Sequence, residues 1–210
     1  MPVMKKPTRL SKFLVWRKNH INDKQFMMIL SIVVGVTSGF AAVLIKNTVH
    51  FIKFLLTSGF VEQYQNYLYM GLPAIGIFLA LVFMLYVLKR RVGHGIPITL
   101  AGISKTGGRI KPHNMYSSVI TSALTVGFGG SVGLEGPTVA TGAAWGSNIG
   151  RFLRLNYRQI VLLLACASAG AMSAIFKAPI AGIVFVLEVL MVDLTMSSLI
   201  PLLLASLTGA

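Results

Sequence analysis

The stretch that decides the fold of this chain reads Gly127-Phe128-Gly129-Gly130-Ser131-Val132-Gly133-Leu134-Glu135-Gly136-Pro137. Within residues 112–150, Glu135 is the only Asp, Glu, Lys or Arg. Glycines let a backbone leave helical geometry and approach a ligand closely, and Pro137 suits the first position of a new helix, where its missing N–H costs nothing. The pattern predicts a chain that breaks inside a membrane, with Glu135 at the N-terminus of a helix.

A carboxylate at such a helix start has a clear physical role. The unpaired N–H groups and the positive end of the helix dipole attract anions, and the Glu135 side chain can be the resident anion. If the carboxylate moves or takes up a proton, the site becomes free for another anion. The alternative is an ordinary acid at a helix start that faces an aqueous loop. A charge within hydrocarbon is costly and usually functional, which favours the first interpretation.

The composition indicates an integral membrane protein. Hydrophobic residues make up 55% of the 210 positions and charged residues 11%, and the mean hydropathy is +0.76. The net charge of +14 comes from 19 Lys and Arg against 5 Asp and Glu. The basic residues fall between apolar segments, as expected for loops that remain on the cytoplasmic side, and no basic face interleaved with aromatic residues indicates nucleic-acid binding.

The sequence gives no sign of an enzyme, a metal site or a cofactor. Cys166 is the only cysteine, so an intrachain disulfide and a thiolate metal site are excluded, and we expect it to be a small core residue. The four histidines have no metal-ligand spacing. We therefore expect no cofactor.

Uncharged and weakly charged apolar runs predict the helices. The basic residues 2–20 suggest an interfacial helix on the cytoplasmic leaflet, with a disordered basic tail as the alternative. The expected helices cover residues 26–56, with Lys46 and Lys53 tolerated by tilting or snorkelling, and then 68–88, 98–103, 115–128, 138–149, 159–176, 180–190 and 194–210. The run 98–103 is too short to span a bilayer, so we expect a re-entrant half-helix.

Two similar pentads precede two of these helices. They are Gly93-His94-Gly95-Ile96-Pro97 and Gly133-Leu134-Glu135-Gly136-Pro137, about forty residues apart. If one helix enters the membrane from the cytoplasm and the other from outside, two positive helix ends converge on an ion at the midplane. Broken helices that meet in this way are a recurring design of transporters.

Three motifs resemble those of the CLC family of chloride channels and chloride/proton antiporters. The two pentads are similar to its Gly-Ser-Gly-Ile-Pro and Gly-Lys/Arg-Glu-Gly-Pro motifs, and Phe176-Lys177-Ala178-Pro179-Ile180-Ala181-Gly182 is similar to Phe-x-Ala-Pro-x-Ala-Gly. The resemblance implies a homodimer with one anion pathway in each subunit and with Glu135 as the gating glutamate. The anion ligands that we expect are Gly93, His94, Gly95, Ile96, Pro97, Gly133, Gly136, Pro137, Thr138 and Val139.

Three departures from the family pattern bear on the mechanism. His94 replaces a serine that contacts the central anion in the family, and Leu134 replaces the basic residue before the gating glutamate. Proton-coupled relatives carry two adjacent glutamates where this chain has Glu188-Val189, and Val189, at the internal proton site, cannot carry a proton. We therefore expect a gated, passive chloride channel. The alternative is a chloride/proton antiporter, and a non-transporting membrane scaffold is a third hypothesis.

The resemblance covers only the first of the two inverted halves of this family. We expect residues 1–22 to be a cytoplasmic basic segment and residues 23–210 to be the N-terminal half of an all-α CLC-type membrane domain. The expected partners are chloride or similar anions, the lipid bilayer and a second copy of the chain. The expected location is the plasma (inner) membrane, with the N-terminus in the cytoplasm.

Overall fold

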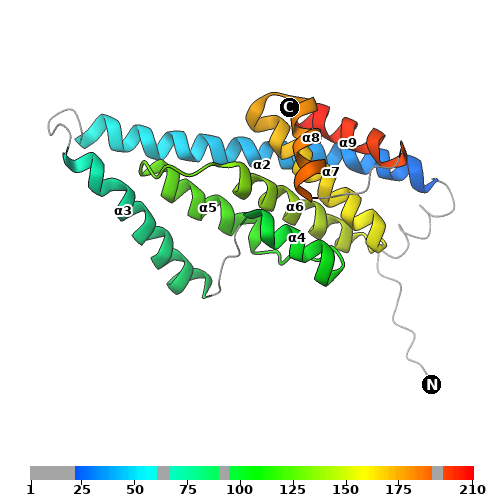
Figure 1. Cartoon of the computed structure of the whole chain (residues 1–210), viewed down its shortest axis with the longest axis horizontal. Helices are drawn as coiled ribbons and strands as arrows, with labels where there is room; N and C mark the ends of the chain where they lie inside the picture. Colours follow the sequence, from blue (N-terminus) through cyan, green and yellow to red (C-terminus); the bar gives the residue numbers. More distant parts are fainter. Residues whose placement is uncertain (1–21, 61–66, 90–94, 191–195) are drawn as a thin grey trace, which may run out of the picture.

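Every element in the described part of the chain is a helix. The computed structural model describes residues 22–60, 67–89, 95–190 and 196–210, and Figure 1 shows how the helices lie. The elements are α2 (Asp23–Phe60), α3 (Tyr67–Val82), the π-helical η1 (Phe83–Leu88), α4 (Gly95–Thr106), α5 (Asn114–Gly127), α6 (Glu135–Phe152), α7 (Tyr157–Phe176), α8 (Pro179–Leu190) and α9 (Met196–Gly209).

The longest helix, α2, runs along most of the long axis of the molecule (Figure 1). Its 38 residues are about 57 Å long at 1.5 Å per residue, almost twice the thickness of a bilayer core of about 30 Å. Lys46 and Lys53 do not interrupt it, as the sequence predicted. The basic segment 1–22 lies outside the described residues except for Asn22, so the interfacial helix expected there stays a prediction.

Within the described residues, three helices are long and apolar enough to cross a membrane. They cover Asp23–Leu56, Gly71–Leu88 and Tyr157–Phe176. Only 11% of the second span is buried against protein, whereas 72% of the third is buried. The helix α3 with η1 therefore presents most of its apolar surface outward, and α7 is the central helix of the fold.

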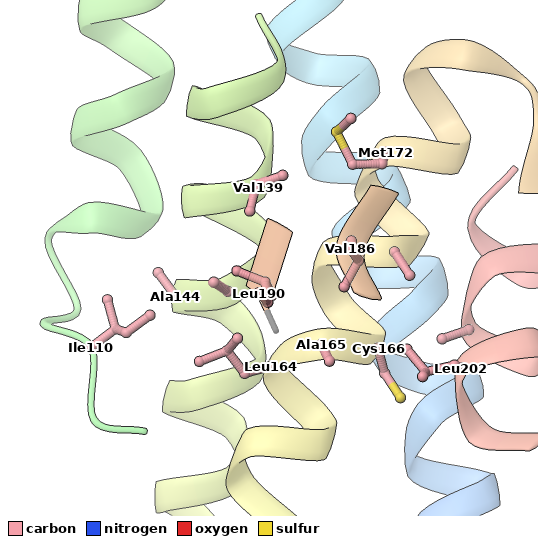
Figure 2. Close-up of a cluster of buried hydrophobic side chains, with 13 residues drawn as sticks. Ile110, Val139, Ala144, Leu164, Ala165, Cys166, Met172, Val186, Leu190 and Leu202 are labelled. Carbon is pink, nitrogen blue, oxygen red and sulfur yellow. The ribbon is translucent and has the colours of Figure 1, made fainter. Parts of the chain in front are cut away.

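The main hydrophobic core surrounds α7. Figure 2 shows Val139 of α6, Val186 and Leu190 of α8 and Leu202 of α9 gathered around Leu164, Cys166 and Met172 of α7. All of these side chains are at most 2% exposed. Cys166 is a fully buried core residue, which confirms the expectation from the sequence.

Small residues allow the helices to pack closely around α7. A Cβ added at Gly146 of α6 would lie 2.5 Å from the carbonyl oxygen of Leu163 and 2.7 Å from the Cα of Leu164. Gly170 of α7 is similarly close to Gly35 of α2 and to Gly209 of α9. Such backbone contacts favour helix association in lipid, where apolar burial does not drive it.

Candidate functional site

The two pentads begin two helices at the same relative position. The helix α4 begins at Gly95 and α6 begins at Glu135, which are the third residues of their pentads. Pro97 and Pro137 are therefore third residues of their helices, so the prediction that Pro137 is the first was wrong. Both prolines are still in the first turn, where a missing N–H breaks no intrahelical hydrogen bond. Gly93 and His94 lie outside the described residues.

The starts of α4 and α6 meet in space. A Cβ added at Gly95 would lie 3.0 Å from the carbonyl carbon of Gly136 and 3.1 Å from its Cα. Gly95 also has a φ of +26°, a conformation that L side chains rarely adopt. Position 95 therefore requires glycine for two reasons, the close approach of the Gly136 backbone and the positive φ. The N-termini of α4 and α6 lie side by side.

Glu135 stands at this meeting point with its side chain exposed. Its carboxylate lies beside the preceding loop, because a Cβ added at Gly133 would be 3.5 Å from Glu135 Oε2. No side chain caps α6. Among the described residues no hydrogen bond is found for the N–H groups of Glu135 and Gly136. The start of α6 thus offers two free backbone N–H donors, those of Glu135 and Gly136, next to the carboxylate of Glu135.

The next residues of α6 turn away from this opening. The N–H and the hydroxyl of Thr138 both donate to the carbonyl oxygen of Leu134, over 3.0 and 2.7 Å. The side chain of Val139 is fully buried in the main core, and Ile96 of α4 packs against the same core. The expectation that Thr138 and Val139 contact an anion stays a prediction. The backbone N–H groups left without a hydrogen bond at the start of α6, within the described residues, are those of Glu135 and Gly136.

A small cavity adjoins the loop before Glu135 on the side of α5. Its volume is about 120 Å³, and its lining includes Gly133, Pro137, Thr121, Ser122 and Thr125. The three hydroxyl groups donate to carbonyl oxygens of their own helix, at 2.6 to 2.9 Å. The cavity therefore presents hydroxyl oxygens rather than donors, and it suits water better than an anion.

The sequence did not predict the contacts that hold the far ends of α4 and α6. Ser147 Oγ of α6 accepts a hydrogen bond from the N–H of Ile110, at 2.9 Å, and donates to the carbonyl oxygen of Gly108, at 2.6 Å. The Tyr157 hydroxyl donates to the carbonyl oxygen of Ile103 at 3.4 Å. These contacts hold the connection after α4 against α6 and the C-terminal part of α4 against α7. Serine is too common in the chain for a pattern to have marked Ser147.

Val189, at the position where the family resemblance implies an internal proton site, also has apolar surroundings. Val189 is half-buried and packs against the main core, whereas the neighbouring Glu188 is exposed. Side chains of this core, including Val139 and Val186, lie between α8 and the first turns of α6 (Figure 2).

Comparisons with known sequences agree with the motifs. The family model described as voltage gated chloride channel matches residues 75–210. A putative chloride channel protein, ClcB-like, of Ralstonia nicotianae is 33% identical over 65% of this chain and 33% of its own length. The H(+)/Cl(-) exchange transporter ClcA of Vibrio vulnificus is 31% identical over 77% of this chain and 36% of its own. The chain thus spans about a third of the length of these relatives.

Solved structures share the fold. A slow cyanobacterial Cl-/H+ antiporter matches with a TM-score of 0.71 and 20% identity over 90% of this chain and 46% of its own. A CLC-type fluoride/proton antiporter matches with a TM-score of 0.71 and 25% identity over 97% of this chain and 47% of its own. Together with the family model, which matches well over half of the residues, these findings show that the chain belongs to the CLC family of integral membrane anion transporters and channels.

Proposed function

We propose that this chain is part of a membrane protein that exchanges chloride, or a similar small anion, for protons, with Glu135 as gate and outer proton carrier. The observation that carries the proposal is the meeting of the starts of α4 and α6 at Gly95 and Gly136, with the Glu135 carboxylate exposed beside them. Two positive helix ends attract an anion, and backbone donors without a lysine or arginine bind it weakly enough to let it leave.

The Glu135 carboxylate competes with the transported anion for the same donors. While it is charged, it occupies the helix ends; when it takes up a proton, it loses its attraction to them and the anion enters. This alternation couples one proton to the movement of anions. The names of the relatives support exchange, since the Vibrio vulnificus protein and both solved structures described above are called exchangers or antiporters.

A passive chloride channel is the second candidate, and one observation favours it. Val189 stands where the family resemblance places an acid at the internal proton site, and it packs against the hydrophobic core. If protons cannot reach Glu135 from the cytoplasmic side, Glu135 gates the pathway without coupling. Exchange by this chain therefore requires a proton route that does not pass through the side chain of Val189.

The deciding experiment measures anion efflux and proton movement together, in liposomes that contain the full-length protein. Chloride and fluoride are tested in parallel, because one similar structure is of a fluoride/proton antiporter. We expect anion efflux with coupled proton uptake in the wild type. In the variant Glu135→Gln, which mimics the protonated side chain, we expect anion efflux to continue without proton movement.

The matched control is Asp23→Asn, which neutralises an exposed carboxylate in the first turn of α2, and there we expect coupling to persist. Wild-type efflux with no proton movement would establish the channel in place of the exchanger. An unchanged coupling in Glu135→Gln would remove Glu135 from its proposed role. If the wild type moves neither anion, the transport proposal itself fails.

The assembly and orientation belong to the same proposal. We infer a homodimer with an anion pathway in each subunit, an N-terminus in the cytoplasm and a location in the plasma (inner) membrane. The exposed apolar residues Ile180 and Val184 of α8 and Leu207 of α9 support a protein partner on that side, because these helices of 12 and 14 residues are too short to span a bilayer alone.

A further inference from the structure

Two loops far apart in the sequence form one surface at one end of the helices. They are the α4–α5 connection, residues 107–113, and the α6–α7 connection, residues 153–156. Ser147 holds the first connection through the Ile110 N–H and the Gly108 carbonyl, and the Tyr157 hydroxyl reaches the carbonyl of Ile103. A Cβ added at Gly108 would also lie 2.9 Å from the side chain of Ile160, so the first connection lies directly against the start of α7, which follows the second connection.

This surface is strongly basic. It carries six exposed side chains, which we call the basic surface: Lys105, Arg109, Lys111, Arg151, Arg154 and Arg158. They are six of the eleven Lys and Arg residues in the described ranges. Throughout those ranges, none of the six forms an ion pair. Six cations held close together without a partner repel one another, so the surface gains free energy when it binds an anion.

Exposed aromatic rings lie among these cations. Phe152 is 67% exposed, and Tyr116 and Tyr157 are each 53% exposed. Phe152 directly follows Arg151 at the end of α6, and Tyr157 directly precedes Arg158 at the start of α7. Tyrosine rings, which are apolar at the body and polar at the hydroxyl, prefer the headgroup level of a membrane, where arginines can bind phosphate. The wholly apolar ring of Phe152 suits the acyl boundary just below that level.

We propose that the basic surface is a binding site for the phosphate headgroups of anionic phospholipids, such as phosphatidylglycerol. Arginine guanidinium groups from both connections bind the phosphate oxygens, and Phe152 inserts between neighbouring lipids. Because Ser147 of α6 holds the connection that follows α4, lipid binding at the two connections also holds the C-terminal end of the half-helix whose start carries Gly95. The site is independent of whether the protein couples anions to protons.

The test uses the full-length protein in phosphatidylcholine nanodiscs, with phosphatidylglycerol added in increasing fraction. Lipid retention is measured by native mass spectrometry and thermal stability by the unfolding temperature. We expect the wild type to retain phosphatidylglycerol and to unfold at higher temperature as its fraction rises. In Arg151→Gln/Arg158→Gln, we expect about a fivefold lower affinity for each charge removed.

The matched control is Lys53→Gln/Lys177→Gln, which removes the same net charge near the C-terminal ends of α2 and α7, away from the basic surface, and should keep retention near the wild-type level. An equal loss of phosphatidylglycerol retention in both double variants would overturn the proposal, because retention would then depend on the net charge of the protein and not on the basic surface. Phe152→Ser should weaken lipid binding without changing charge. If inorganic pyrophosphate stabilises the protein as well as phosphatidylglycerol does, the surface binds soluble anions, and the lipid site is refuted.

Discussion

Gly95 is the residue on which the geometry of the proposed anion site depends most directly. Its φ of +26° and the 3.0 Å from an added Cβ to the Gly136 carbonyl carbon leave no space for a side chain. The neighbouring atoms are backbone, so they cannot move aside as a flexible side chain would. The close approach of two helix starts, and not any one charged group, therefore defines the site.

We predict that Gly95→Ala in the full-length protein weakens chloride binding about tenfold. An alanine in a left-handed conformation costs about 1–2 kcal/mol, and relief of that strain moves the start of α4 away from Gly136. Isothermal titration with chloride measures the affinity. Gly71→Ala on α3 is the control, because an added Cβ there meets nothing within 4 Å. An unchanged affinity in Gly95→Ala would show that the two helix starts do not hold the anion together.

At the scale of the helices, the sequence predicted nearly all of the elements in the described ranges. Long apolar runs marked α2, α3 and α7, and the pentads and the Ala178-Pro179 break marked the short helices. The start of α6 was placed three residues too late, at Thr138 instead of Glu135. Glycine and proline indicate that a helix begins nearby, but both are tolerated within the first turn, so they do not fix its first residue.

Side-chain contacts between the helices were not predictable from the sequence. The Ser206 hydroxyl donates to the Pro179 carbonyl oxygen at 2.6 Å and lies 2.6 Å from Ser173 Oγ, which ties α7, α8 and α9 together. Pro179 and Ser173 are 27 and 33 positions from Ser206, and a serine hydroxyl can equally bond to its own helix, as that of Ser173 does to the carbonyl oxygen of Ala169 at 2.7 Å. The small residues of α6 and α7 did indicate close packing, and the structure confirms it.

We predict that Gly146→Ala destabilises the protein by about 1–3 kcal/mol, the usual cost of inserting atoms into a packed interface. The new Cβ would meet the backbone of Leu163 and Leu164 and push α6 away from α7. Denaturant titration followed by circular dichroism in mixed micelles gives the free energy of unfolding. Gly71→Ala, with open space around it, should show no such loss. A Gly146→Ala variant as stable as wild type would mean that α6 and α7 adjust without cost.

At the scale of the whole molecule, the described residues supply only one side of the proposed anion site. The Glu135 side chain is exposed, and the chain corresponds to 46–47% of the solved structures that share its fold. The two pentads predicted that Gly95 and Gly136 lie close together, because each pentad marks the start of a helix. They could not predict what faces Glu135, since that surface depends on residues beyond the match.

We therefore predict that the 210-residue chain, reconstituted by itself in liposomes, conducts no chloride above the level of protein-free liposomes. In an inverted-repeat transporter the ion binds at the interface between the repeats, so one repeat leaves the ion open to water or lipid on one side. Unsatisfied backbone donors near Glu135 and Gly136 would then be hydrated rather than arranged around an anion. The control is the full-length protein in the same lipids, measured by chloride-electrode efflux. Robust efflux from the 210-residue chain, abolished by Gly95→Ala, would show that copies of this chain supply the missing side to one another.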